Sequence, residues 1–319
     1  MNHRDVLHHT VIVILIVGLF TTSCDRKTPS ASNDVIVFLA ACFSPLMDGI
    51  RREVEKEINL QIHPEVSGSQ VVCRKVTELG RDCDLMMVAD HRLFKMIASS
   101  HVSWRIDFAH DEVVLGVGIR AKMVDEVEED WVSVLRNDSI SLGRVDENLG
   151  PIGYRTLLVW KLKEMSGYPD LTEELKEKNE KVVDHVLHLA TLLKAGDLDY
   201  GFLYRSTCVE HDIRFIPLDN EINLGATDVD YSSAQISFKA PESVNESVMN
   251  VKGSPIIYSL TIPISAIHRK QAVALIHYIF AKLQTQSDAF GYRFFEPRFF
   301  GPEDDFEQFK NVTTYAGIF

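Results

Sequence analysis

From Asp34 onward, the chain alternates short apolar runs with segments of helical periodicity. The run Val35–Ala40 predicts a buried strand, and the segment after it predicts a helix with Ser44 as N-cap and Pro45 as its first residue. The alternation continues with a strand at 60–66, a helix capped by Ser69 and ended by Gly80, and a strand at 84–88. Such alternation predicts an α/β fold with a parallel sheet covered by helices on both faces. Ligands of such sheets bind at the carboxyl ends of the strands.

Length and charge narrow the class of protein further. A chain of 319 residues with 45% hydrophobic content is long enough for about two globular domains. The formal net charge of -13 argues against nucleic acid as a partner, because phosphate backbones need a basic surface. A small buried anion remains compatible with this charge, since backbone amides act over a few ångströms and distant surface charge is screened.

The N-terminus carries a targeting pattern. Arg4 precedes the apolar run Val11–Phe20, which is too short to span a bilayer and is typical of a signal peptide. The small residues that follow end in Cys24, and the pattern resembles a bacterial lipoprotein signal, although Thr21 stands where leucine is usual. We expect a signal peptide over 1–24 ending in a lipidated Cys24, and a flexible tether over 25–33. The alternative is an ordinary cleaved signal peptide with an incidental cysteine.

The remaining cysteines and histidines indicate no metal-cation site. No pair among Cys42, Cys73, Cys83 and Cys208 has CxxC spacing, and no histidine lies at zinc-ligand spacing from them. We expect these four cysteines to be free thiols, because a fold of this size does not need disulfides. His185 and His188 are three residues apart on a predicted helix, where packing or surface exposure is the simpler interpretation.

The stretch Gly150–Arg155 (GPIGYR) begins a predicted helix and is typical of an anion-binding helix N-terminus. The first amides of a helix have no partner inside it, and the helix dipole directs its positive end the same way. Two further loops, ACFS after the first strand and SGS after the second, also lead into helices. The sequence therefore predicts several amide clusters near one edge of the sheet.

Several stretches together resemble the archaeal-type molybdate and tungstate binding proteins of ABC importers. The stretches that carry the resemblance are Ser67–Gly80, Asp84–Asp90, Phe108–Val117, Gly150–Arg155, Leu192–Ser206 and Ile216–Gly225. The resemblance implies a two-domain α/β fold like that of periplasmic binding proteins of type II, with the ligand cleft between the domains. It places domain I at 34–115 and 256–319, and domain II at 116–255.

The resemblance also implies a set of ligand-binding residues. Carried over by position, they are Ala41, Cys42, Ser69, Gly150, Pro151, Ile152 and Leu203, and we expect Tyr154 or Tyr204 to add a donor. The family has an aspartate at the position of Gly150 and a glutamate at that of Leu203, so both carboxylates that expand the coordination of the bound metal are missing here. The remaining donors are amides and hydroxyls, which hold an intact anion by hydrogen bonds.

The resulting interpretation is a monomeric, extracytoplasmic, lipid-anchored protein that captures molybdate or tungstate and delivers it to an ABC permease. It needs no cofactor and is not an enzyme. One alternative is a binding protein for another oxyanion such as sulfate; another is a sensor or scavenger that no longer serves transport. A thiol hydrolase using Cys42 as nucleophile is disfavoured, because no histidine lies in a motif that supplies a base.

Overall fold

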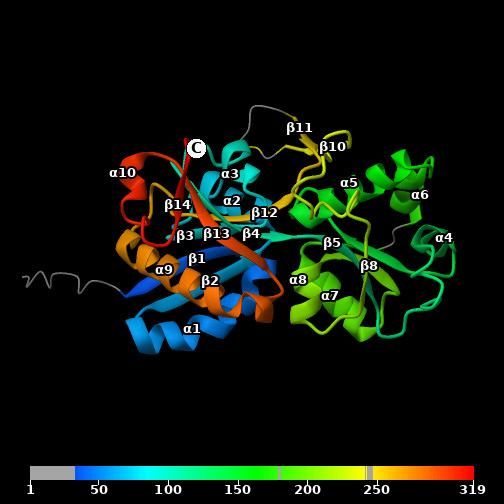
Figure 1. The fold of residues 1–319 in the computed structure, drawn as a ribbon, viewed down its shortest axis with the longest axis horizontal. Coiled ribbons are helices and arrows are strands. Elements are labelled where there is room, and N and C mark those ends of the chain that lie inside the picture. Colours follow the sequence, from blue (N-terminus) through cyan, green and yellow to red (C-terminus); the bar gives the residue numbers. More distant parts are fainter. Residues whose placement is uncertain (1–32, 179–180, 241, 243–246) are drawn as a thin grey trace, which may run out of the picture. The chain divides into compact units, whose positions relative to one another are not determined.

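The computed structural model describes residues 33–319 except 179–180, 241 and 243–246. The predicted signal peptide, Cys24 and nearly all of the tether lie outside the described residues. The described chain contains two mixed sheets and one separate hairpin (Figure 1). Each sheet with the helices packed on it is called a lobe below.

The first lobe is built on a seven-stranded sheet in the order β14-β13-β4-β12-β3-β1-β2. Its strands are β1 (Asp34–Ala40), β2 (Gln61–Ser67), β3 (Leu85–Val88), β4 (Arg105–Asp111), β12 (Ile256–Thr261), β13 (Arg293–Phe300) and β14 (Thr314–Gly317). Its helices are η1 (Ala41–Phe43), α1 (Ser44–Ile58), α2 (Ser69–Thr77), α3 (Arg92–Met96), α9 (Arg269–Gln286), η2 (Ser287–Phe290) and α10 (Glu303–Phe306). Helices α1 and α9 cover one face of the sheet, and α2 and α3 cover the other (Figure 1).

The second lobe is built on a five-stranded sheet in the order β7-β6-β8-β5-β9. Its strands are β5 (Val113–Val117), β6 (Leu142–Val145), β7 (Lys181–Val183), β8 (Tyr200–Tyr204) and β9 (Phe215–Pro217). Its helices are α4 (Trp131–Arg136), α5 (Pro151–Met165), α6 (Leu171–Lys178), α7 (Val186–Ala195) and α8 (Arg205–Glu210). The hairpin of β10 (Gln235–Lys239) and β11 (Val248–Lys252) packs against α5.

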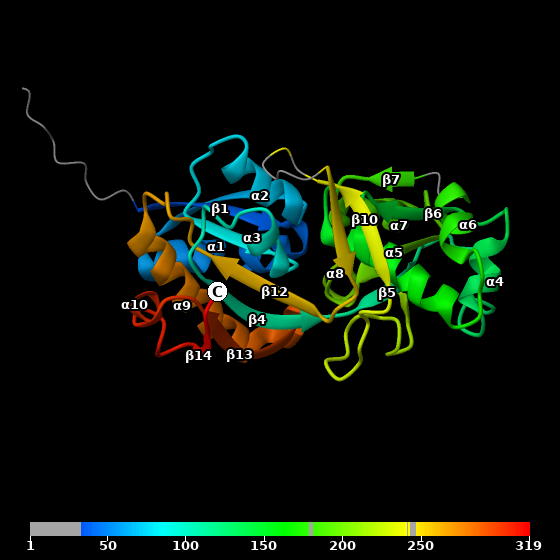
Figure 2. The ribbon, with the colours of Figure 1, turned by 90° about the horizontal axis from the view of Figure 1, so that it is seen from above.

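Two neighbouring segments connect the lobes. Strand β4 of the first sheet leads through Glu112 directly into β5 of the second. The return segment enters β12 at Ile256, which pairs with Asp111 at the end of β4 (Figure 2). The predicted domain boundaries stay a prediction, because residues 33–319 form one compact unit by their contacts.

The predicted alternation of strands and helices is confirmed, with several corrections. Strand β1 pairs in parallel with β2 and β3, but β12, β4 and β13 add antiparallel pairs, so the sheet is mixed. Neither predicted N-cap is correct. The 3-10 turn η1 precedes Ser44, and Gly68 caps α2 while Ser69 is its first helical residue. Near the end of the chain, Arg293–Phe300 form strand β13, which no strand pattern in the sequence indicated.

Asp84 ties the start of β3 to two other elements of the first lobe. Its carboxylate is 2% exposed and accepts hydrogen bonds from the amide of Ile36 at 2.9 Å and the amide of His268 at 2.8 Å. It also lies 3.0 Å from Nδ1 of His268. A buried donor that loses its acceptor costs its full desolvation free energy.

We predict that Asp84→Ala lowers the free energy of unfolding by about 2–4 kcal/mol, because two buried amides lose their acceptor. Urea unfolding followed by circular dichroism measures this change. Asp82→Ala is the control, since Asp82 is exposed and two residues away. Equal stability of the two variants would contradict the role given to Asp84.

Candidate functional site

A small cavity lies where strands of both sheets end. It is lined by Ala40, Ala41, Cys42, Gly68, Ser69, Ala89, Val145, Gly150, Pro151, Ile152, His185, Val186 and Tyr204. Each of these residues ends a strand, follows its carboxyl end or opens the next helix: β1, β2 and β3 in the first lobe, and β6, β7 and β8 in the second. This is the edge at which α/β sheets bind ligands, and here the edges of two sheets meet.

Three helices of eight or more residues begin at this cavity. The N-caps of α2 and α5 are Gly68 and Gly150, and neither has a side chain that occupies the first amides. Helix α7 begins at Val186 after His185, whose Nδ1 accepts from the amide of His188 at 3.2 Å. Pro151 has no amide hydrogen, and the amides of Gly153 and His188 donate to the carbonyls of Gly150 and His185, so the donors left are the other amides nearest each N-cap. The helix dipoles favour negative charge at the same place. The cavity therefore has the arrangement of backbone donors with which helix N-termini bind anions.

The two lobes touch through their main chains beside the cavity. A Cβ on Gly68 would lie 2.0 Å from the carbonyl oxygen of Leu149 in the second lobe. The side chain of Gln70 also crosses, donating to the carbonyl of Glu147 at 2.9 Å. Only glycine allows this approach at position 68, so the start of α2 and the start of α5 face the cavity from opposite sides.

Ser69 contributes a hydroxyl to the cavity wall. It is fully buried, and its Oγ accepts a hydrogen bond from the amide of Ala89 at 3.0 Å. A serine oxygen that accepts in this way keeps its own hydrogen for another acceptor. The side chain is therefore held in place with a donor to offer.

A buried ion-pair network stands behind the cavity. Asp90 is 2% exposed and pairs with Arg92 at 2.6 Å and with Arg155 at 3.2 Å. Burial opposes ionisation of Asp90, but the two guanidinium groups hold its pKa well below the ordinary value. Tyr154, which we expected to be a ligand donor, donates its hydroxyl to Asp90 at 2.6 Å and does not line the cavity.

Leu203 also lies outside the cavity lining. It is fully buried in β8, where it pairs with Val114, and its Cδ1 would be 2.9 Å from a Cβ on Gly116. Successive side chains of a strand point to opposite faces. Because Tyr204 lines the cavity, Leu203 faces away from it, and a carboxylate placed at 203 in this backbone would be buried in the core. The ligand role predicted for Leu203 therefore has no support in its position.

The thiol of Cys42 is poorly suited to nucleophilic chemistry. It is 1% exposed, and burial, together with the negative charges of Asp111 and Glu210, raises its pKa well above the ordinary value. The thiolate is the reactive form of cysteine, so this side chain stays a neutral thiol. All four cysteines in the described part of the chain are free and buried, as predicted.

Sequence reasoning missed the contribution of His185 and Val186. We interpreted His185 and His188 as packing or surface residues, whereas His185 caps α7 at the cavity. The described residues hold no cluster of three or more possible metal ligands. The available signal was positional: His185 follows a short β-branched run and opens an amphipathic helix, as Ser69 does in the first lobe.

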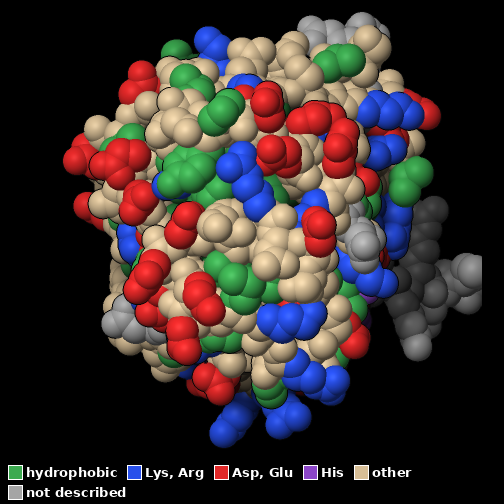
Figure 3. Space-filling view, turned by 90° about the vertical axis from the view of Figure 1, so that its right-hand side faces the viewer, with side chains coloured by type: hydrophobic (Ala, Val, Ile, Leu, Met, Phe, Trp, Pro, Cys, Tyr) green, Lys and Arg blue, Asp and Glu red, His purple; other side chains and the backbone are tan. Residues whose placement is uncertain are grey.

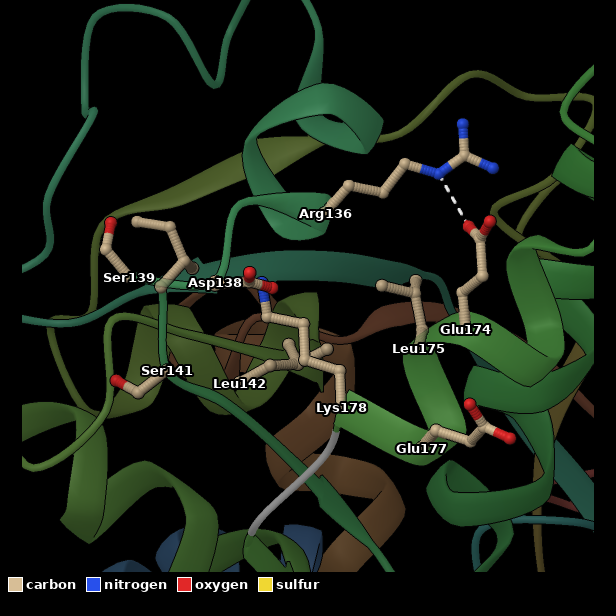
Figure 4. Close-up of a pocket in the computed structure, with 10 residues that line it drawn as sticks. Arg136, Asp138, Ser139, Ser141, Leu142, Glu174, Leu175, Glu177 and Lys178 are labelled. Carbon is tan, nitrogen blue, oxygen red and sulfur yellow. Dashed lines mark hydrogen bonds and ion pairs between the residues drawn. The ribbon is translucent and has the colours of Figure 1, made fainter.

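A larger hollow lies elsewhere, on the outer side of the second lobe. Its volume is about 840 Å³, and its lining includes Ser141 and Leu142 at the start of β6 (Figure 4). This is the opposite end of the strand from the end that binds ligands. Arg136 pairs there with Glu174 at 2.6 Å, and Lys178 donates to the carbonyl of Leu135 at 2.6 Å. Because its basic groups are already paired, we do not assign the ligand to this hollow.

The surface over α4 and α6 shows acidic and basic side chains interspersed, without a continuous basic area (Figure 3). This mixed surface agrees with the acidic net charge of the chain, and it offers no basic area on this face to which a phosphate backbone could bind. Within the described residues, no helix combines the length and the apolar character needed to cross a bilayer.

Two sheets joined by crossing strands, with a cavity between their carboxyl edges, define a periplasmic binding-protein fold. Solved structures share it. The periplasmic molybdate-binding protein of Azotobacter vinelandii matches with a TM-score of 0.56 at 15% identity, over 81% of this chain and 98% of that one. The sulfate-binding protein SubI of Mycobacterium tuberculosis matches with a TM-score of 0.56 at 14% identity, over 90% and 93%.

The chain belongs to the bacterial extracellular solute-binding protein family, whose model matches residues 35–293. An uncharacterized solute-binding protein of Petrotoga mobilis is 30% identical over 274 residues, which cover 83% of this chain and 84% of the relative. The molybdate/tungstate-binding protein WtpA of Thermococcus kodakarensis is 28% identical over 304 residues, covering 83% and 85%. The predicted family and fold class are thereby confirmed, and the chain is an extracytoplasmic solute-binding protein.

We predict that the cysteines of folded Cys24→Ser protein do not react with Ellman's reagent at pH 8 within minutes, and that four thiols react after unfolding in guanidinium chloride. The reason is burial, which both shields the sulfur atoms and raises the pKa of Cys42. Ser99→Cys, at an exposed position, should react at once in the folded protein. Rapid labelling of Cys42 in the folded state would contradict the assignment.

Proposed function

We propose that this protein captures a fully deprotonated tetrahedral oxyanion, molybdate or tungstate first among them, and delivers it to an ABC permease. The observation that carries the proposal is the cavity, where three helix N-termini from two lobes meet and those of α2 and α5 have no capping side chain. Among its described lining residues there is no aspartate, glutamate, lysine or arginine. The ligand charge is then balanced by amides, hydroxyls and helix dipoles.

The size of the cavity suits a small ligand. About 20 Å³ is open to the centre of a water molecule, which is space for one water or for the closely spaced oxygens of one compact anion. An organic solute of ordinary size does not fit this space. The lining is rich in small residues, so the boundary of the cavity is set largely by main chain.

The relatives support molybdate and tungstate, since proteins named for binding these anions align along most of the chain. Because no carboxylate lines the cavity, we propose that the anion stays four-coordinate and is held only by hydrogen bonds. Sulfate has the same shape and charge and is the second candidate. A sensor or scavenger would use the same cavity without a permease. We propose no cofactor and a monomeric protein.

We predict that the mature protein binds molybdate, tungstate or sulfate at least about tenfold more tightly than phosphate at pH 7. Phosphate keeps a proton at this pH. Because the cavity offers hydrogen-bond donors and no carboxylate, this proton finds no acceptor, and the unmade hydrogen bond lowers the affinity for phosphate. Isothermal titration calorimetry with each anion measures the affinities. Binding of none of the four would sink the proposal, and preference for phosphate would reverse the assigned chemistry.

A serine variant locates binding in this cavity. Ser69→Ala should weaken affinity for the preferred anion by about 1–3 kcal/mol, the value of a hydrogen bond to a charged partner. Ser259→Ala is the matched control: this serine is also fully buried, but it donates to the carbonyl of Ile106 inside the first sheet. Equal affinity of the two variants would place the anion elsewhere.

We further propose that Cys24 is acylated and anchors the protein to a membrane. The support is the sequence pattern, with a short apolar run before the cysteine and a polar tether after it. The tether would leave the binding lobes free to meet a permease.

We predict that mass spectrometry of the membrane fraction finds a lipid-modified Cys24 as the first residue. Cys24→Ser should shift the protein into the soluble extracytoplasmic fraction, because the anchor is lost. Cys73→Ser, a buried cysteine of the first lobe, is the control and should stay with the membrane. An unmodified soluble wild-type protein would refute the anchor and leave the ordinary signal peptide.

A further inference from the structure

Glu210 is an acid whose carboxyl group is buried without a hydrogen bond. It belongs to α8 of the second lobe, and both of its carboxyl oxygens are buried and have no hydrogen-bond partner among the described residues. No lysine or arginine in the described part of the chain pairs with it. An ionised carboxylate that is buried without a partner is very unfavourable, so such a group keeps its proton instead.

The neighbours of Glu210 also favour its protonated form. The hydroxyl of Tyr292 lies beside it, and a hydroxyl that donated to Glu210 would lower the pKa of the acid. This hydroxyl, however, donates its only hydrogen to the carbonyl of Cys42 at 2.7 Å. Its oxygen can accept a hydrogen bond from a carboxylic acid, but it has none to give to a carboxylate. The negative charge of Asp111 acts in the same direction.

Asp111 differs from Glu210 in having hydrogen-bond donors. It is 2% exposed, and it accepts from the hydroxyl of Tyr258 at 2.6 Å, the amide of Glu112 at 2.8 Å and the amide of Ser206 at 3.3 Å. Of two neighbouring buried acids, the one with donors keeps the charge and the other keeps the proton. Burial, together with the charge of Asp111, raises the pKa of Glu210 to about 9.

The other titratable groups around α8 bring no free positive charge to this carboxyl group. His211 follows on the chain, and burial lowers the pKa of its imidazole, which is therefore neutral at pH 7. Lys194 of α7 donates to the carbonyl of His211 at 2.9 Å, and Arg205 of α8 lies 3.7 Å from the carboxylate of Glu112. Tyr204 at the end of β8 stays neutral, because burial raises its pKa.

The burial of Glu210 depends on contact between the two lobes. Gly291 of the first lobe, with φ of +65°, lies against α8 of the second lobe. A Cβ at this position would lie 2.8 Å from Cα of Ser206 and 3.0 Å from Cβ of Val209. Tyr292, which lies beside Glu210, follows directly in the chain. Separation of the lobes would therefore admit water to the carboxyl group.

We propose that Glu210 takes up a proton from water when the lobes close on the oxyanion, so that the protein binds one proton together with each anion. The cavity walls come from both lobes, whose main chains touch at Gly68 and Leu149, so an anion enters while the lobes are apart. Closure then removes the water that solvated the carboxylate. The inference rests on the proposed function and adds a second bound species to it.

The proton also serves the binding of the anion. Cys42 lines the cavity, and Glu210 lies close enough for its charge to act on the Cys42 thiol. An ionised Glu210 would therefore place a negative charge behind the cavity wall, where it would repel the bound anion. Protonation removes this repulsion.

The expected pH dependence follows from the two values of the pKa of Glu210. A carboxyl group in water has its ordinary pKa of 4.5, and the pKa is about 9 when the lobes are closed. Between these values closure takes up one proton, so the affinity should fall about tenfold for each unit by which the pH rises. The fall should level off above about pH 9, because the carboxyl group is then ionised in both states.

The first test is calorimetry of the wild type with molybdate, tungstate and sulfate in buffers of different ionisation enthalpy. At pH 7.5 it should show uptake of nearly one proton per anion, and affinity should be about tenfold lower than at pH 6.5. Glu210→Gln resembles the protonated acid, so it should show no uptake and should bind at least about tenfold more tightly than the wild type at pH 7.5. Asp212→Asn is the control: this acid is exposed, and its variant should keep the wild-type pH dependence.

The second test observes the carboxyl group directly. In protein labelled with carbon-13 at glutamate Cδ, addition of the anion at pH 7.5 should move one resonance from the position of a carboxylate to that of a neutral acid. This resonance should be missing from Glu210→Gln and present in Asp212→Asn. If Glu210→Gln does not fold, proton uptake and the neutral glutamate resonance of the wild type still decide the question.

The outcomes separate the two proposals. A wild-type protein that binds none of the three anions contradicts the proposed function. A wild-type protein that binds one of them without proton uptake, and with equal affinity at pH 6.5 and 7.5, contradicts this inference alone. Proton uptake that persists in Glu210→Gln would assign the proton to another group and would also overturn it.

Discussion

The constraint on which the rest of this structure depends is the unmet hydrogen bonding of helix first turns. Helices α2, α5 and α7 cannot satisfy their first amides internally, and glycine N-caps at positions 68 and 150 supply no side chain to do it for them. Strand order then brings these ends to one place, because each helix follows a strand whose carboxyl end lies at the shared edge. The result is positive potential without a cationic side chain in the cavity lining that the structure describes.

The buried charges of the site lie one layer behind this lining. Asp90 is neutralised by Arg92 and Arg155, and the hydroxyl of Tyr154 completes its bonding. Such a network is favourable only when nearly every member is satisfied. The backbone and the side chains have separate roles here: the backbone lines the cavity with helix N-termini, while Arg155 behind it holds the hydroxyl of Tyr204 in place.

The sequence predicted the cavity better from strand ends than from residue types. Ser69, Gly150 and Ile152 were expected at the site both from family position and because their loops lead into helices, and they line it. Leu203 and Tyr154 were expected through family position and through donor chemistry, and neither lines it. Strand alternation explains the first, since Tyr204 takes the cavity side of β8. The second depended on Asp90, a long-range partner that no local pattern discloses.

The same distinction holds for the fold. The sequence predicted the helices α5 and α7, the first from its Gly-Pro start and the second from its amphipathic pattern. It did not locate β13, whose alternation is broken and whose pairing with β4 joins residues distant in sequence. It also placed the N-cap of α2 one residue late, since Ser69 has the right chemistry for a cap but bonds to Ala89 instead. Tertiary contacts determine these positions, and local sequence patterns do not indicate such contacts.

The contact of Gly68 with the main chain of Leu149 makes the site sensitive to the size of the solute. Two backbones in contact form a stop that no side-chain rotamer can relax, so the lobes can approach each other no more closely than this contact allows. A solute too large for the remaining space would hold the lobes apart, and one too small would leave amides unbonded. The size of the solute thereby affects the distance between the lobes, and another protein can detect this distance without contacting the ligand.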